Sequence, residues 1–398
     1  MPRPKIAAVV TEYRRYSHAQ HILDRFLWGY GWDNHHHRPP MDLVALYTDQ
    51  VPESDLSRDR AKLFPTMKIY PTIAEALTRG GEKLDVDGVL LIGEHGRYPK
   101  NEKGQTLYPR YEFFKQITDV YRASGRTAPI FNDKHLSWNW EWAKEMVDTA
   151  KDLEFAFLAG SSLPVVPRIP PVDMPLGAGV QEALCVAVGG PDGYDIHALE
   201  AIQCLVERRR GGETGVVAIQ ALRGDAVWKA MRAGSWEAGG WDPALFEACL
   251  CRSHKLTPAR KGFNHILPTP EQIPGLVNQE PICYRCQYTD GLKSTMLLVE
   301  GLVGDFTFAA RLAGQRDPLS TQVFLPPREV CNFFSPLVNH IEKMFLTGKA
   351  PYPVERTLLT TGLTAAGVES LWQDQKRLET PHLAIQYEPT KESTFWRS

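Results

Sequence analysis

The opening of the chain decides its fold class, because residues 6–29 read IAAVVTEYRRYSHAQHILDRFLWG. The first five residues are apolar and rich in Ile and Val, which is typical of a buried strand. A polar turn follows, and apolar residues at helical spacing then run from about Ser17 to Gly29. A strand followed directly by a helix is the first half of a βαβ unit, and such units build parallel sheets.

The same alternation continues to about residue 160. Further strands are predicted at residues 43–47, 86–92, 128–131 and 155–158, and helical patterns lie at 73–78, 111–124 and 138–151. Strands that alternate with helices predict a doubly wound parallel sheet, so we assign residues 1–160 to a Rossmann-like domain. Right-handed crossovers bring the carboxyl ends of such strands to one edge, where ligands bind.

The second half of the chain follows a different pattern. A proline-rich connector, GSSLPVVPRIPP, occupies residues 160–171. The predicted elements beyond it are strands at 180–188, 216–222, 282–288, 295–301 and 306–312 and helices at 194–209, 329–346 and 365–376. The last three strands follow one another without helices, which favours antiparallel pairing. We therefore assign residues 161–398 to an α+β domain with a mainly antiparallel sheet.

Composition narrows the classes of partner. The chain of 398 residues is 43% hydrophobic and 23% charged, with a formal net charge of −2. Such a balance offers no field that would attract nucleic acid or an anionic membrane, and no apolar run approaches the roughly 18 residues of a membrane span. Seven cysteines and the absence of a signal-peptide pattern favour reduced thiols and a cytoplasmic protein. We expect a small-molecule partner.

The turn after the first strand departs from the usual dinucleotide pattern. A Rossmann-type site normally carries G-x-G-x-x-G there, whereas residues 11–18 contain no glycine and include Tyr13 and Tyr16. Arg14 and the helix N-terminus could still hold a phosphate or carboxylate, or could form a solvated turn. Asp49 ends the second strand, where an acidic residue normally binds ribose, although an ordinary loop carboxylate fits equally well.

Two further segments carry groups suited to proton transfer. Lys134 follows the fourth strand and precedes a helix, so its ammonium is expected to face the cleft. His197 and Glu200 lie three residues apart on one helical face. That spacing suits a proton-transfer pair in which Glu200 orients the histidine, a pair of metal ligands, or a plain surface pair.

These segments together resemble a known family. Asp133-Lys134 before a helix resembles the E-K-P element of the glucose–fructose oxidoreductase/inositol dehydrogenase (Gfo/Idh/MocA) family, and the segment 193–200 is similar to its G-x-H-x-x-D element. The order of elements matches as well. The resemblance implies oxidation or reduction of a sugar or polyol with NAD or NADP, Lys134 and His197 beside the reacting carbon, and homo-oligomers that form through the second sheet.

The residues expected at this site follow from these patterns. We predict that Lys134, His197 and Glu200 are catalytic. The predicted dinucleotide contacts are Thr11, Tyr13, Arg14, Asp49 and Glu94.

Two other hypotheses stay open. Carboxylates and imidazoles together suit a divalent transition metal, so a metal-dependent lyase, hydratase or isomerase could act on a keto-sugar without a nicotinamide. The candidate ligands of such a metal are Glu12, His18, Glu94, His95, His135 and His197. The third hypothesis is a sugar-binding protein without turnover.

Overall fold

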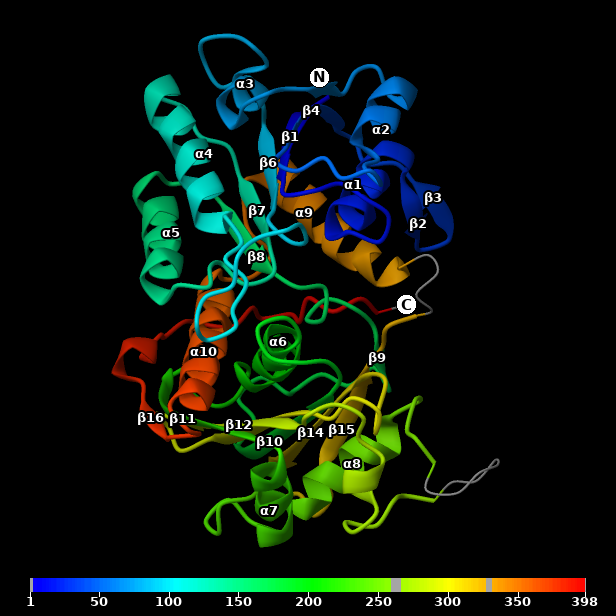
Figure 1. Ribbon diagram of the computed structural model, residues 1–398, viewed down its shortest axis with the longest axis vertical. Helices are drawn as coiled ribbons and strands as arrows, with labels where there is room; N and C mark the ends of the chain where they lie inside the picture. The colour runs from blue at the N-terminus through cyan, green and yellow to red at the C-terminus, as the bar shows by residue number, and fades with distance from the viewer. Residues whose placement is uncertain (1–2, 259–265, 327–330, 398) are drawn as a thin grey trace.

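The first sheet is a six-stranded parallel sheet in the upper half of Figure 1. The computed structural model describes residues 3–258, 266–326 and 331–397. The strands run in the order β5-β4-β1-β6-β7-β8, and every neighbouring pair is parallel. Their bounds are β1 Lys5–Val10, β4 Asp42–Thr48, β5 Lys68–Ile69, β6 Gly88–Ile92, β7 Ile130–Asp133 and β8 Phe157–Gly160. This strand order is that of dinucleotide-binding folds, so the predicted doubly wound Rossmann-like sheet is confirmed.

Helices cover both faces of this sheet. One face packs against α3, α4 and α5, and the other packs against α1, the short α2 and α9. Their bounds are α1 His18–Trp28, α2 Ser57–Leu63, α3 Ile73–Thr78, α4 Arg110–Ser124, α5 Trp140–Asp152 and α9 Ser335–Thr347. The helix predicted to begin at residue 329 is α9, and residues 327–330 lie outside the described residues.

The position of α9 bears on the division of the chain into domains. This helix belongs to the second half of the sequence, yet Leu337, Ile341 and Met344 lie in the same apolar core as β1 and α1. The hairpin of β2 (Tyr30–Trp32) and β3 (His35–His37) also docks on α9, where Glu342 Oε2 lies 2.7 Å from the ring Nε2 of His37. The boundary at residue 160 stays a prediction, and the segment around α9 returns to the first sheet.

The second sheet has eight strands in the order β16-β11-β12-β13-β10-β14-β15-β9. Neighbouring strands are antiparallel, except that β10 and β13 are parallel. The bounds are β9 Arg168–Ile169, β10 Val180–Ala187, β11 Val216–Arg223, β12 Ile282–Tyr288, β13 Lys293–Leu298, β14 Phe306–Leu312, β15 Leu319–Val323 and β16 Leu378–Glu379. The predicted α+β arrangement with a mainly antiparallel sheet is therefore confirmed.

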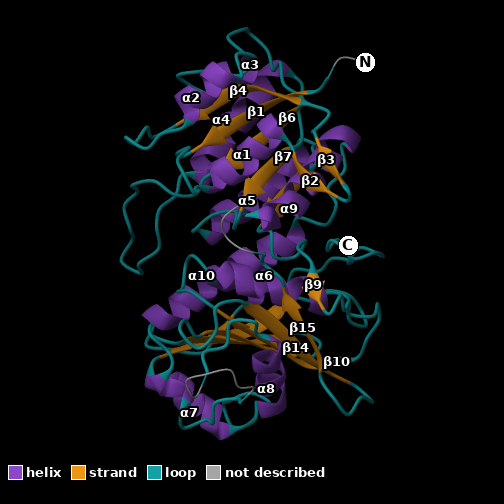
Figure 2. Cartoon of the chain, turned by 90° about the vertical axis from the view of Figure 1, so that its right-hand side faces the viewer, coloured by secondary structure: helices purple, strands orange, loops and turns teal. Residues whose placement is uncertain are grey.

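Helices also lie on both faces of the second sheet (Figures 1 and 2). The face toward the first sheet carries α6 and α10, and the opposite face carries α7 and α8. Their bounds are α6 Asp195–Val206, α7 Asp225–Ala233, α8 Pro243–Arg252 and α10 Glu355–Trp372, and short 3₁₀ turns lie at Ile273–Gly275, Asn332–Phe334 and Pro381–Leu383. The sheet on which the oligomer prediction rested is therefore covered by helices of its own chain, and the oligomeric state stays a prediction.

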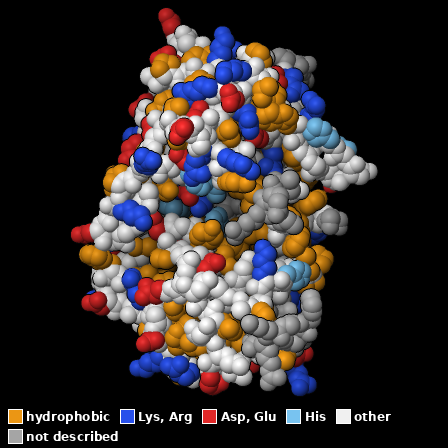
Figure 3. Space-filling model, turned by 45° about the vertical axis from the view of Figure 1, so that its right-hand side comes forward, with side chains coloured by type: hydrophobic (Ala, Val, Ile, Leu, Met, Phe, Trp, Pro, Cys, Tyr) orange, Lys and Arg blue, Asp and Glu red, His pale blue; other side chains and the backbone are white. Residues whose placement is uncertain are grey.

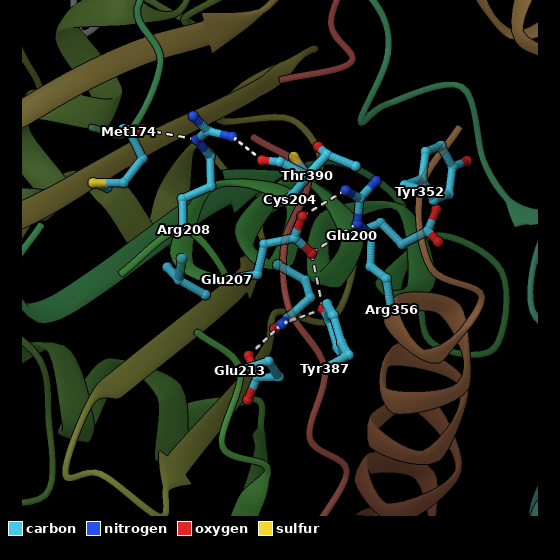
Figure 4. Close-up of polar contacts among 12 residues, drawn as sticks. Met174, Glu200, Cys204, Glu207, Arg208, Glu213, Tyr352, Arg356, Tyr387 and Thr390 are labelled. Atoms are coloured by element: carbon cyan, nitrogen blue, oxygen red, sulfur yellow. Dashed lines mark hydrogen bonds and ion pairs between the residues drawn. The ribbon is translucent and has the colours of Figure 1, made fainter. Parts of the chain in front are cut away.

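A buried polar network fixes α6 against the C-terminal segment (Figure 4). Glu207, at the end of α6, pairs with Arg356, at the start of α10, with 2.8 Å between Oε2 and Nε. The Tyr387 hydroxyl donates to the same oxygen of Glu207 at 2.8 Å, and the Arg208 guanidinium donates to the Thr390 carbonyl at 2.8 Å. Because the side chains of Glu207 and Arg356 are each only 2% exposed, this network holds the helix that carries His197 in a defined position.

No helix in the described part of the chain is long and apolar enough to cross a membrane.

Candidate active site

A cavity of about 590 Å³ lies between the carboxyl edge of the first sheet and the second sheet. Figure 3 shows histidine side chains in the hollow midway along the molecule. Its walls come from the starts of α1 and α6, the ends of β6 and β7, and the segments that follow β8 and β15. We call five of its residues the cavity floor: Glu94, His95, Asp133, Lys134 and His197.

Strained backbone clusters around this cavity. Tyr16, His95, Lys134 and Cys331 line it, and all four have positive φ angles, of 64°, 72°, 61° and 47°. The left-handed region is unfavourable for residues other than glycine and costs on the order of 1–3 kcal/mol per residue. Such conformations gather at sites where side-chain direction matters, which supports this cavity as the functional site.

An ion-pair network fixes the charge of Lys134. Its Nζ donates to Glu94 Oε1 at 2.8 Å and to the Gly193 carbonyl at 3.2 Å, and Arg110 Nη2 donates to Glu94 Oε2 at 2.6 Å. Burial opposes both charges, but the Lys134 and Arg110 cations hold the pKa of Glu94 well below its usual range, and Glu94 raises the pKa of Lys134. Lys134 is therefore a fixed cation that can donate a hydrogen bond to a ligand oxygen.

A histidine–carboxylate pair lies on the same cavity wall. His18 is the first residue of α1, and its Nδ1 lies 2.6 Å from Oδ2 of Asp133, the last residue of β7. Asp133 is 1% exposed, and the ring of His18 contacts that of Phe334 with 5.1 Å between centroids. A buried carboxylate on one ring nitrogen orients the imidazole and leaves the other nitrogen for proton transfer. His18 is one of the predicted metal ligands, and its pairing with Asp133 is not predicted from the sequence.

Two more histidines on the cavity floor are uncharged. Burial, with His18 as the next cause, lowers the pKa of His95 to about 4, and burial with the nearby Lys134 cation holds the pKa of His197 well below its usual range. Neither ring has a hydrogen-bond partner among the residues that the structure describes. A neutral imidazole offers one donor and one acceptor, which matches the hydroxyl groups of a ligand.

Glu200 is hydrogen-bonded to groups other than His197, and its catalytic role stays a prediction. Its Oε2 accepts a hydrogen bond from the backbone N–H of Ser161 at 2.6 Å, and its Oε1 lies 3.0 Å from the Thr357 hydroxyl. No described hydrogen bond joins it to His197, because the carboxylate points from α6 toward the chain after β8. Burial raises the pKa of Glu200 to about 7. Glu200 therefore holds the backbone beside the cavity.

The turn that would bind the pyrophosphate of a dinucleotide is closed by its own contacts. Tyr13 is fully buried and its hydroxyl bonds to Asp24. The backbone N–H of Arg14 and that of Gln20 donate to the Ser17 hydroxyl at 3.2 and 3.1 Å. A pyrophosphate binds to free N–H groups at such a helix N-terminus, and in this chain the N–H groups of Arg14 and Gln20 already have an acceptor in Ser17.

Asp49, the predicted ribose contact, is exposed and has hydrogen-bond partners within the chain. Asp49 accepts hydrogen bonds from Tyr98 at 2.6 Å and Tyr47 at 3.0 Å, while Thr11 is buried and donates to the Glu94 carbonyl at 2.7 Å. Since Arg14 pairs with Glu12 and Glu94 pairs with Lys134, every predicted dinucleotide contact has a partner within the chain. The turn therefore lacks the glycines through which this fold normally binds NAD or NADP, and the predicted contact residues make bonds within the chain.

The predicted metal ligands do not all line the cavity. Among the described residues, no three His, Cys, Asp or Glu side chains are arranged to hold a metal ion. Glu12 is paired with Arg14, and the ring Nε2 of His135 lies 2.9 Å from Arg110 Nη1. The predicted ligands His18, Glu94, His95 and His197 do line one cavity, and metal binding there stays a prediction.

No protein-family model matches the chain, and no curated protein sequence matches it. Solved structures do match. Myo-inositol dehydrogenase from Lactobacillus casei, in complex with NAD(H) and myo-inositol, is 12% identical with a TM-score of 0.55 over 99% of this chain and 100% of that chain.

Two further structures agree in fold. Scyllo-inositol dehydrogenase from Lactobacillus casei, with bound NAD(H) and scyllo-inositol, is 10% identical with a TM-score of 0.56 over 95% of this chain and 99% of that chain. GenD2 from gentamicin A biosynthesis, in complex with NAD, is 12% identical with a TM-score of 0.56 over 95% and 97% of the two chains. Identities this low establish the fold alone. The chain therefore shares the fold of these inositol dehydrogenases.

Proposed function

We propose that this chain is an enzyme that acts on an uncharged sugar or polyol derivative by proton transfer, without a nicotinamide. The observation that carries the proposal is the His18–Asp133 pair, at 2.6 Å, in the same cavity as the Lys134–Glu94 pair. A base beside a fixed cation is the arrangement that enolisation of a keto-sugar requires. The reaction class is that of isomerases, lyases and hydratases.

Each group has a defined part in such a reaction. His18 Nε2 accepts a proton from the carbon next to the carbonyl of the substrate, and the electron pair of that C–H bond forms the double bond of an enediolate. Negative charge develops on the carbonyl oxygen, where the ammonium of Lys134 stabilises it. The imidazolium of His18, held by Asp133, then returns the proton to carbon or delivers it to a leaving hydroxyl.

The charge of the cavity floor supports an uncharged, hydroxyl-rich substrate. The carboxylates of Glu94 and Asp133 face the cations of Lys134 and Arg110, and the neutral rings of His95 and His197 add no charge. Lys255, on the wall of the cavity away from this floor, is its one lining cation without an ion pair among the described residues. Hydroxyl groups suit neutral imidazoles because they both donate and accept hydrogen bonds.

Deuterium exchange tests this proposal directly. The chain is incubated in D₂O with D-fructose, L-sorbose and 2-keto-myo-inositol, and proton NMR follows the hydrogens next to each carbonyl. We expect exchange with at least one of these ketoses, and its loss in His18→Asn. If no ketose exchanges, or if His18→Asn exchanges at the original rate, the proposal is wrong.

The second candidate is an oxidoreductase of sugars or polyols that uses NAD or NADP. It is favoured by the inositol dehydrogenases of the same fold, whose structures hold NAD(H) and an inositol. Calorimetric titration with NADH and NADPH separates the two candidates. Binding in the micromolar range would favour the oxidoreductase, whereas no binding below about 1 mM, which corresponds to about −4 kcal/mol, would favour the nicotinamide-free enzyme.

A further inference from the structure

The cavity is larger and less polar than one sugar ring requires. Its volume of about 590 Å³ falls within the range of about 300–1,000 Å³ that is typical of sites for drug-sized ligands. The cavity floor is polar, and the remainder of the wall is mixed, with a substantial apolar part. The apolar residues are Leu163, Val188, Phe306, Leu325, Pro326, Phe333 and Phe334.

These apolar residues come from both halves of the molecule, since Phe334 packs in the core of the first sheet and Phe306 in the core of the second. Leu163 follows β8, Val188 follows β10, Phe306 begins β14, and the others belong to the segment between β15 and α9. Leu325, Pro326 and Phe333 are partly exposed, whereas Asp133 and Lys134 on the floor are 1% and 5% exposed. We call Leu325, Pro326 and Phe333 the cavity mouth.

Aromatic rings continue from the mouth to the floor. The rings of Phe333 and Phe334 are 5.0 Å apart, and Phe334 contacts His18 and stacks on His21 at 5.0 Å. On the other side, the ring of Phe306 lies 6.3 Å from that of His197. A ligand whose polar part reaches His18 and His197 must therefore extend along aromatic surface.

We infer that the substrate is a glycoside with an apolar aglycone and a keto group on its sugar ring, which lies on the cavity floor, while the aryl or alkyl group lies in the cavity mouth. This inference rests on the proposed function, because it takes the floor as the site of the sugar. A free sugar would leave the mouth in contact with water, whereas burial of an aryl group there releases that water and adds binding free energy.

Matched glycosides test this inference by calorimetry. The affinities of methyl and phenyl glycosides of D-glucose, D-galactose and D-mannose are compared. For a sugar that binds, we expect the phenyl glycoside to bind about tenfold to a hundredfold more tightly than the methyl glycoside, the gain expected from burying one aromatic side group. Equal affinities of the two glycosides would overturn the inference and leave the proposed function intact, while no binding of any sugar or glycoside would count against the proposed function itself.

Variants of the mouth show where the aglycone binds. Phe333→Ser and Leu325→Ser should each bring the affinities for the phenyl and methyl glycosides to within about threefold of each other, because each removes apolar contact area. The affinity for the methyl glycoside should stay unchanged. Trp372→Ser is the matched control, since Trp372 is 50% exposed and does not line the cavity. If both mouth variants still bind the phenyl glycoside as much more tightly than the methyl glycoside as the original chain does, the inference is wrong. Melting temperatures confirm that each variant is folded.

Discussion

Two corners of the same sheet edge differ in how their polar groups are used. The first corner comprises the ends of β1 and β4 with the turns that follow them, residues 11–17 and 49–57. There, Ser17 and Gln20 accept from the turn's own N–H groups, and Asp49 binds Tyr98. The second corner comprises the ends of β6 and β7, where the polar groups that face the cavity are partly left without protein partners. We call them the closed corner and the open corner.

A chain can keep a fold while the residues at the usual ligand site of that fold differ. In dinucleotide folds, the closed corner is the site of the pyrophosphate and ribose. In this chain that corner is filled by its own side chains, and the first residue of α1, His18, pairs instead with Asp133 across the edge. The scaffold is retained, and the groups that we propose as catalytic lie at the open corner. The predictions below test that contrast.

The largest expected effect belongs to the pair at the open corner. His18→Asn and Asp133→Asn should each lower the rate of substrate deuterium exchange by about 10²–10⁴, the usual contribution of general acid–base catalysis. Substrate affinity should change little, because the variants keep the shape of the cavity. The exchange rate and the binding constant are measured on the same preparations. His35→Asn, an exposed histidine of the hairpin, is the control, and an equal loss in that variant would remove the special role of the pair.

The next effect concerns stability. Lys134→Met removes a charged hydrogen bond to Glu94 but leaves that carboxylate paired with Arg110, so the free energy of unfolding should fall by about 1.5–3 kcal/mol. Lys103→Met is the matched control, because Lys103 pairs with Glu369 at a site where both side chains are about 30% exposed, and an exposed pair contributes about 1 kcal/mol or less. Urea unfolding measures both. Equal losses would show that the network at the open corner is no more coupled than a surface pair.

A comparable effect depends on pH. Burial raises the pKa of Glu200 to about 7 from its ordinary value near 4.5, so the folded state binds a proton that the unfolded state releases. This contribution to stability is complete below pH 4.5 and is lost as the pH rises toward 7. The difference in unfolding free energy between the original chain and Glu200→Gln should therefore fall by about 3 kcal/mol over that range. Turnover of the variant should stay within about threefold, and a hundredfold loss would return Glu200 to the catalytic groups.

The sequence predicted the scaffold well because its signals are local. Alternating apolar runs and helical patterns located five of the six parallel strands, and the missed strand, β5, is only two residues long. The same patterns located the antiparallel run of β12, β13 and β14. They also predicted that Glu94, Lys134 and His197 meet at one cleft, since strand ends and helix starts share an edge.

The pairings at that edge could not be predicted because they depend on distances between elements far apart in the sequence. His18 and Asp133 are 115 residues apart, and their contact depends on how α1 enters the fold after a turn without glycine. Glu200 has the spacing from His197 that the G-x-H-x-x-D element requires, but its side chain turns toward Ser161. The covering of the second sheet by α7 and α8, and the return of α9 to the first sheet, are likewise results of tertiary packing.

The smallest effect probes the closed corner. Tyr98→Phe removes the hydrogen bond between the Tyr98 hydroxyl and Asp49, which should cost about 0.5–1.5 kcal/mol of unfolding free energy in a urea titration. The loss should leave turnover unchanged, because neither side chain lines the cavity. Removing one bond should also leave the corner closed to NADH, since the N–H groups of Arg14 and Gln20 still donate to Ser17. If Tyr98→Phe bound NADH in the micromolar range, the closed corner would be a gated dinucleotide site. Both corners would then bind ligands, and the difference between them would be wrong.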